Sequence, residues 1–218
     1  MKLDLYYAPK TCALVPYVTL TEAGADFTVH NVNSRSGQLR TPAFLALNPK
    51  HKVPVLVIDG EPLTENDAIQ IWIARQFPQA RLLPQEPMAE IRAISLMSWF
   101  SSSIHPHLTP NARPENYCDL PGSAEAVKRA GNRLLFEDFT IADGLLQDRT
   151  FFFDHFTAVD AYFFWCFRRA LSFNLDLSAF PNCRLHFGRM QLRPSVQKVQ
   201  AHEKAVDAEF ARTAQPMN

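Results

Sequence analysis

The chain has 218 residues, and 47% of them are apolar, which is enough to bury one large hydrophobic core or two small ones. Its 22 Lys and Arg balance its 22 Asp and Glu, so it lacks the excess positive charge of a nucleic-acid-binding protein. The sequence has no apolar stretch near the roughly 18 residues that a membrane span needs, and its N-terminus lacks the apolar core of a signal peptide.

The cysteines are few, scattered and without a CxxC pair: Cys12, Cys118, Cys166 and Cys183. Secreted disulfide frameworks and structural zinc sites have denser and more regular spacings. We therefore expect free thiols, no metal site, and a cytoplasmic location.

The first third of the chain alternates between short strand and helix patterns. Strands are expected at 3–7, 27–30, 53–58 and 63–64, and helices at 14–23, at 42–47 and from 68 onward. Gly24 closes the first helix, and Asp59-Gly60 favours a hairpin turn between the last two strands. The order β-α-β-α-β-β-α predicts a small α/β domain over residues 1–76.

The remainder of the chain has only helical patterns. Three prolines within residues 77–87 indicate a linker, and residues 88–218 are expected to form an all-helical domain. Within it, Thr157 and Asp160 have the spacing of a capping box, which assigns them a structural role. The predicted fold class is thus α/β plus all-α.

The most informative stretch for chemistry runs from residue 48 to residue 69. A proline that enters a strand lacks an N–H for the ladder, so a cis Val53-Pro54 bond is expected, with the Val53 backbone turned outward to pair with an extended peptide. Glu65 and Asn66 lie at the start of a helix, where N–H groups attract a carboxylate and the Glu65 side chain can meet an ammonium. Together these features predict a receptor for a γ-glutamyl tripeptide.

Three separate motifs of this sequence resemble those of the cytosolic glutathione transferases and follow one another in the same order along the chain. They are NPKHKVPVL followed by a DG hairpin and LTENDAI, LYYAPKTCALVP at the start, and FTAVDAYFFW in the helical part. The second motif is similar to the start of the bacterial, beta-type members, in which a cysteine lies against the glutathione sulfur. The resemblance covers nearly the whole chain and implies a thioredoxin-like domain followed by a helical-bundle domain.

The resemblance also implies roles for individual residues. Val53 and Pro54 fall on the position that binds the glutathione backbone, Glu65 and Asn66 on the γ-glutamyl site, and Lys52 near the glycine end. Cys12 falls on the beta-type cysteine. His105 is expected at the second-substrate pocket, and Tyr7 is a further candidate there.

The chemistry requires a glutathione thiolate, and three groups compete to stabilise it. Cys12 ranks first and the Thr11 hydroxyl second, because both lie at a helix N-terminus, whose dipole is also expected to depress the pKa of Cys12. A tyrosine at the end of the first strand, Tyr6 or Tyr7, ranks third.

The predicted function is conjugation of glutathione to small hydrophobic electrophiles, with glutathione as co-substrate and no cofactor. Two alternatives stay open: a glutathione-dependent redox enzyme and a non-catalytic glutathione-binding protein. Because Val15 stands three residues after Cys12, the redox alternative would use one thiol only. The resemblance further implies a homodimer with contacts from the helices starting near Asn66 and Met88, and neither nucleic acid nor membrane as a partner.

Overall fold

The computed structural model describes residues 1–213, and the chain divides into two compact units. The first unit comprises residues 1–82 together with residues 191–213, and the second comprises residues 83–190. The last helix therefore belongs to the first unit. The domain limits expected from the sequence, 1–76 and 88–218, stay a prediction.

A four-stranded mixed sheet forms the centre of the first unit. Its strands are β1 (Leu3–Tyr7), β2 (Thr28–Asn31), β3 (Val55–Ile58) and β4 (Glu61–Thr64), in the order β2-β1-β3-β4. β1 pairs parallel with β2 and antiparallel with β3, and β4 is antiparallel to β3. The helices between them are α1 (Leu14–Glu22), α2 (Pro42–Leu47) and α3 (Asn66–Gln76), so the expected β-α-β-α-β-β-α order is confirmed.

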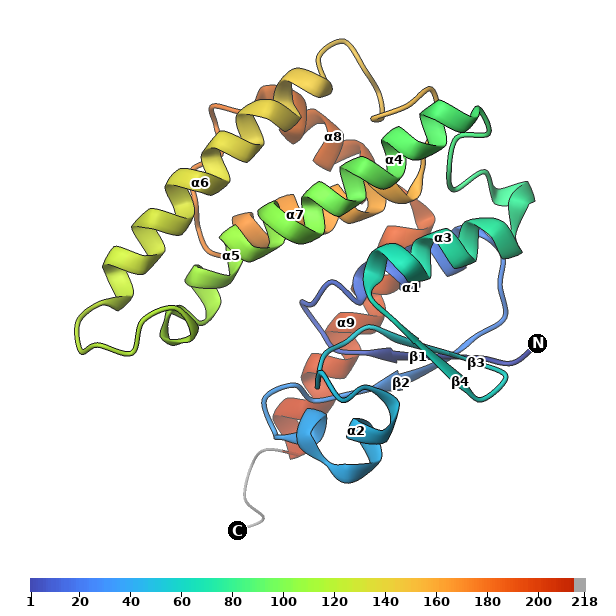
Figure 1. Ribbon diagram of the computed structural model, residues 1–218, viewed down its shortest axis with the longest axis horizontal. Helices are drawn as coiled ribbons and strands as arrows, with labels where there is room; N and C mark the ends of the chain where they lie inside the picture. The colour runs from blue at the N-terminus through green and yellow to red at the C-terminus, as the bar shows by residue number, and fades with distance from the viewer. Residues whose placement is uncertain (214–218) are drawn as a thin grey trace. The chain divides into compact units, whose positions relative to one another are not determined.

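The alternation of side chains along β1 assigns the two faces of the sheet. Leu3, Leu5 and Tyr7 are buried on one face, where the Tyr7 ring lies 5.8 Å from that of Tyr17 in α1. Figure 1 shows α1 and α3 on one side of the sheet and α2 on the other. Tyr6 points to the opposite face, where its ring centroid lies 6.0 Å from that of Phe44 in α2. The sheet is therefore covered on both sides, as the thioredoxin-like architecture requires.

Several element boundaries differ by one or two residues from the sequence-based expectation, and two of these shifts bear on the site. β3 begins at Val55 and not at Val53, because Pro54 has no N–H to give to the ladder. α3 begins at Asn66, two residues before the expected start, and its N-cap residue Glu65 has a positive φ of 71°.

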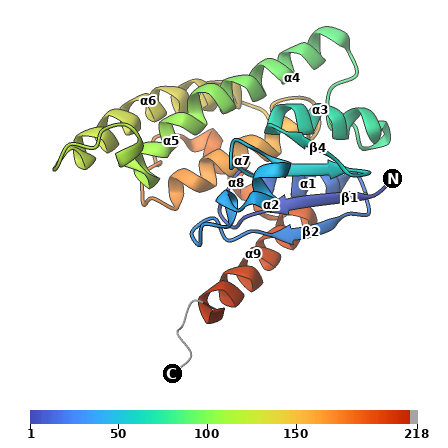
Figure 2. The ribbon, with the colours of Figure 1, turned by 60° about the horizontal axis from the view of Figure 1, so that its bottom comes forward.

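The last helix, α9 (Pro194–Thr213), packs against α1 in the first unit (Figure 2). At its start, the Arg193 guanidinium donates to both carboxylate oxygens of Glu22 at 3.0 and 2.7 Å. Ser195 also donates to Glu22. This part-buried, bidentate ion pair fixes where α9 meets α1.

The second unit is a bundle of helices. Its members are α4 (Pro87–Trp99), α5 (His105–Ala112), α6 (Ala124–Leu145), α7 (Ala158–Leu171) and α8 (Pro181–Gln191). α7 is buried almost all round, as expected for a central helix. The capping box at its start is confirmed, with the Asp160 carboxylate accepting from the Thr157 N–H at 2.8 Å. Among residues 1–213, no helix is long and apolar enough to cross a membrane.

A π-helical turn, Phe100–Ile104, joins α4 to α5, and α5 packs closely on α6. The closest approach is at Gly131 of α6. A Cβ built there would lie 2.7 Å from Cγ and 2.9 Å from Cβ of Pro110, whose ring cannot rotate away. Gly144 of the same helix has no atom within 4 Å of the corresponding position.

We expect the two glycines to respond oppositely to alanine. Gly131→Ala should lower the free energy of unfolding by about 1–3 kcal/mol, because the added methyl overpacks the contact with Pro110. Gly144→Ala should leave it unchanged or raise it by up to about 1 kcal/mol, because alanine favours the helix and the site is open. Denaturant unfolding of both variants measures the difference, and equal effects would contradict the close approach of α5 and α6.

Candidate active site

The Val53-Pro54 peptide bond is cis, as the sequence predicts. The Val53 carbonyl accepts a hydrogen bond from the Cys12 thiol, with Sγ 3.7 Å from the oxygen. Among the described residues, the Val53 N–H has no acceptor. The backbone of Val53 thus offers a pairing edge directly beside the Cys12 sulfur.

Glu65 follows β4 and precedes the first turn of α3, and its side chain is 67% exposed. Lys50 Nζ lies 2.5 Å from Glu65 Oε1 and 2.8 Å from Thr64 Oγ1. This ion pair was not anticipated from the sequence. It leaves the carboxylate at the surface, where a ligand ammonium has access to it.

The Asn66 side chain points inward and is 6% exposed. Its Nδ2 donates to the Cys12 carbonyl at 3.0 Å, and its Oδ1 accepts from Gln70 Nε2 at 3.4 Å. The side chain of Asn66 is therefore engaged with the protein. What it leaves for a ligand carboxylate is the backbone N–H at the start of α3.

Cys12 is 8% exposed, and burial raises the pKa of its thiol to about 12. The position of Cys12 near a helix N-terminus predicts a depressed thiol pKa, and this prediction is wrong. α1 begins only at Leu14, and removal from water disfavours the thiolate more than the dipole favours it. Cys12 is thus a protonated thiol, able to donate a hydrogen bond.

Thr11 stabilises the turn before α1. Its Oγ1 donates to the Ala8 carbonyl at 2.7 Å and accepts from the Ala13 N–H at 3.3 Å. Lys52 is exposed, and its carbonyl accepts from the Asn48 amide at 2.7 Å. Both side chains lie on segments adjoining Cys12 and Val53.

Tyr7 has no exposed surface. Its hydroxyl donates to Glu203 Oε2 of α9 at 2.9 Å, and the same oxygen accepts from the Lys10 N–H at 3.0 Å. Neither role expected for Tyr7, at the second-substrate pocket or as donor to the thiolate, gains support from this geometry.

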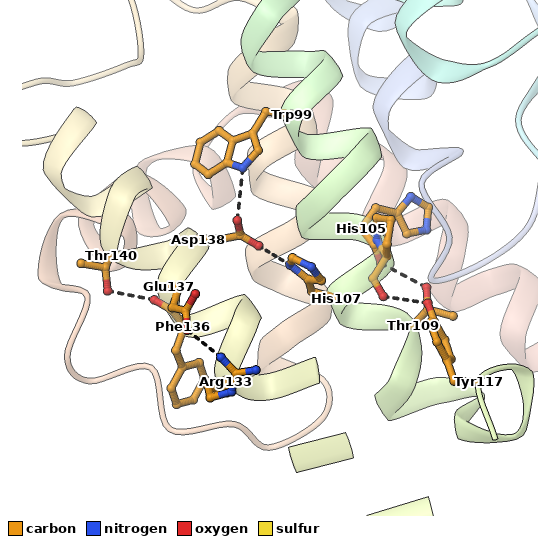
Figure 3. Close-up of polar contacts among 11 residues, drawn as sticks. Trp99, His105, His107, Thr109, Tyr117, Arg133, Phe136, Glu137, Asp138 and Thr140 are labelled. Carbon is orange, nitrogen blue, oxygen red and sulfur yellow. Dashed lines mark hydrogen bonds and ion pairs between the residues drawn. The ribbon is translucent and has the colours of Figure 1, made fainter. Parts of the chain in front are cut away.

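His105 lies in the second unit at the start of α5, where its ring meets Trp165 edge-on at 4.4 Å. It points away from a separate polar cluster around Asp138 (Figure 3). There the Asp138 carboxylate accepts hydrogen bonds from His107 Nδ1 at 2.6 Å and from Trp99 Nε1 at 3.1 Å. The His107 cluster joins three helices of the bundle. Across residues 1–213, the structure has no group of three or more His, Cys, Asp or Glu side chains arranged to hold a metal.

Comparison with known proteins gives the family. The model of the glutathione S-transferase N-terminal domain matches residues 1–75. Over 198 residues the chain is 30% identical to glutathione S-transferase GstA of Escherichia coli O157:H7, covering 89% of this chain and 96% of that protein. The chain belongs to the glutathione S-transferase family.

Solved structures of bacterial transferases have the same fold. A beta-class glutathione S-transferase of Sphingomonas chungbukensis is 32% identical, with a TM-score of 0.79 and coverage of 92% of this chain and 98% of that one. A sphingomonad glutathione S-transferase, solved in complex with glutathione, is 30% identical with a TM-score of 0.81 and the same coverage. The resemblance inferred from the three sequence motifs is confirmed.

Three residues of this transferase that contact predicted site residues were missed in the sequence: Lys50, Gln70 and Glu203. A signal existed for two of them. Gln70 stands four residues after Asn66, on the buried face of α3 that includes Ile69 and Ile73. Glu203 interrupts the buried valine stripe of α9. A polar residue at an apolar helical position is a recognisable sign of a specific buried partner.

The thiols of the transferase should differ in reactivity. A hydrogen bond with Ser123 lowers the pKa of the Cys118 thiol, whereas burial raises the pKa values of Cys12 and Cys183. With limiting iodoacetamide at pH 8, Cys118 should be alkylated first, roughly 10-fold or more ahead of Cys12, because the thiolate is the nucleophile. Mass-spectrometric peptide mapping over time gives the order, and Cys12 reacting first would contradict the burial argument.

Proposed function

We propose that this transferase conjugates the glutathione thiolate to small hydrophobic electrophiles, and that glutathione binds in the first unit. The supporting observation is that Cys12 contacts both Val53 and Asn66. The pairing edge for the peptide, the sulfur position and the start of α3 are thereby neighbours. Cys12, Thr11, Lys52, Val53, Pro54, Glu65 and Asn66 make up the proposed glutathione site.

In this proposal each end of glutathione meets a complementary group. The glutathione cysteine pairs with the backbone of Val53, its γ-glutamyl carboxylate meets the Asn66 N–H at the helix start, and its ammonium meets Glu65. Lys52 lies on the side of the glycine carboxylate. The ligand ammonium then shares the Glu65 carboxylate with Lys50, which has a second partner in Thr64.

A free thiol with a pKa of about 8.5 is only about 3% ionised at pH 7, so the site must favour the glutathione thiolate. Cys12, whose raised pKa keeps it protonated, would supply an S–H donor to that sulfur by exchanging its bond to the Val53 carbonyl for one to the thiolate. Thr11 supplies a hydroxyl on the same turn. This hydroxyl would donate its hydrogen bond to the thiolate in place of the Ala8 carbonyl. The raised pKa of Cys12 also disfavours the redox alternative, in which Cys12 itself would have to be the nucleophile.

The electrophile and the assembly are parts of the same proposal. We place His105 at the second-substrate pocket and assign Tyr7 to the support of the first unit. Two apolar side chains of α4, Met88 and Ile91, are more than half exposed and offer a contact surface for a second copy of the chain. The four free thiols favour the cytoplasm, and the proposed reaction uses no cofactor.

The reaction and its site are tested together through Glu65. Glu65→Gln should raise the glutathione Kd about 10-fold, because it removes the charge that pairs with the ligand ammonium. The exposed Glu61→Gln, on the strand that leads to Glu65, is the matched control. Calorimetry gives the Kd, and the rate of conjugation to a chlorodinitrobenzene-type electrophile gives the activity. Unchanged affinity in Glu65→Gln would remove Glu65 from the site, and an inactive wild-type protein that binds glutathione would favour the non-catalytic alternative.

The assembly is tested by light scattering at micromolar concentration, where we expect the mass of two chains. Ile91→Glu should shift the mass toward that of one chain, because a charge would be buried at the contact. Leu192→Glu, at a residue that is 75% exposed between α8 and α9, should leave the mass unchanged. A single-chain mass for the wild-type protein would refute the proposed dimer.

A further inference from the structure

A buried chain of amide groups connects the interior of α3 to the backbone of Cys12. Gln70 Nε2 donates to Asn66 Oδ1, and Asn66 Nδ2 donates to the Cys12 carbonyl. The orientation of both amides follows from the last link. A carbonyl only accepts, so Asn66 must present its NH₂ group to Cys12 and its oxygen to Gln70, which must then present its own NH₂ group.

This orientation leaves one polar atom without compensation. Gln70 is fully buried, and its Oε1 has no hydrogen-bond partner among the described residues. A buried amide oxygen without a partner costs free energy that an apolar side chain of similar size, such as methionine, would not cost. Fold stability alone therefore does not explain a glutamine at this position of α3.

We propose that Gln70 is a positioning residue for the transferase reaction, which acts through Asn66 to fix the Cys12 peptide and hence the sulfur site. The proposal rests on the proposed function, since it assigns the sulfur of glutathione to the neighbourhood of Cys12. The hydrogen-bonded connection from Gln70 to the Cys12 peptide runs through the Asn66 amide. It restricts the Asn66 amide to the orientation that holds the Cys12 carbonyl.

The Cys12 peptide is where such restriction matters. Its carbonyl is held by Asn66, its thiol is directed at the Val53 carbonyl, and the next N–H, of Ala13, donates to Thr11 Oγ1. A rotation of this peptide would move the thiol and remove the Ala13 N–H from Thr11 Oγ1, which would keep only its bond to the Ala8 carbonyl. The direction of the Cys12 thiol and one of the two hydrogen bonds of the Thr11 hydroxyl therefore depend on the hydrogen bond from Asn66.

The same residue links two parts of the ligand site. The backbone N–H of Asn66 is the proposed partner of the γ-glutamyl carboxylate, while its side chain holds the Cys12 carbonyl. Gln70 stands four residues later on the same helix face and fixes that side chain. Loss of Gln70 should consequently affect the sulfur chemistry much more than the binding of the γ-glutamyl end.

The test is Gln70→Met, with Gln76→Met as control, an exposed glutamine at the end of the same helix. For Gln70→Met we expect kcat to fall about 10-fold, the KM for glutathione to stay within about twofold, and the melting temperature to hold or rise. A purely structural role predicts the reverse, with a lower melting temperature and an unchanged kcat. Either an unchanged kcat or a loss of activity that only follows a loss of folded protein would overturn the proposal.

A double-mutant cycle adds a second criterion. Because Gln70 acts through Asn66, adding Gln70→Met to Asn66→Ser should lower kcat no further than Asn66→Ser alone. Additive losses would show that Gln70 acts by another route and would refute the proposal.

A measurement without glutathione keeps the proposal separate from the proposed function. Alkylation of Cys12 in the ligand-free protein should be about 10-fold faster in Gln70→Met than in wild type, because the loosened peptide exposes the thiol more often. An unchanged alkylation rate refutes the positioning role, even in a protein that conjugates glutathione. A wild-type protein that binds no glutathione refutes the proposed function and leaves the alkylation result to decide on Gln70.

Discussion

The register of β3 against its two neighbours is the constraint on which the proposed site depends. Val55, the first residue of β3, lies opposite Tyr6 near the end of β1 and opposite Thr64 at the end of β4. Since both pairings are antiparallel, the chain leaves β1 and β4 at the same edge of the sheet at which it enters β3. The loop with Cys12, the Val53-Pro54 turn and Glu65 meet there as a result.

The proposed site at this end of the sheet combines exposed charged side chains with buried neutral ones. The two groups assigned to the charged ends of glutathione, Glu65 and Lys52, are exposed, whereas Cys12 and the Asn66 side chain are buried. Charged side chains are thus available for exchange with a charged ligand, and the neutral hydrogen-bonding groups keep a fixed geometry. In a site of low polarity, a fixed S–H or O–H donor stabilises an anionic sulfur more strongly than it would in water.

Local sequence signals anticipated the secondary structure of the first unit and part of its chemistry. The strand and helix order, the capping box at Thr157 and the cis Val53-Pro54 bond follow from residue types within a few positions of one another. The pKa of Cys12 did not follow, because it depends on burial by residues distant in the chain. The inward orientation of Asn66 was equally out of reach, since its partner Cys12 is separated from it by three strands and two α-helices.

The membership of α9 in the first unit has a consequence for the order in which the protein can be completed. A ribosome releases residues 1–82 first and then the whole second unit before it reaches Glu203 and Arg193. At about 5–20 residues per second, Glu203 is synthesised on the order of ten seconds after the strands of the sheet. Its carboxylate accepts hydrogen bonds from the Tyr7 hydroxyl and the Lys10 N–H. During that interval the turn that leads to Cys12 lacks the hydrogen bond from the Lys10 N–H to Glu203. A nascent chain therefore forms the sheet early and completes the turn before Cys12 only at the end of translation.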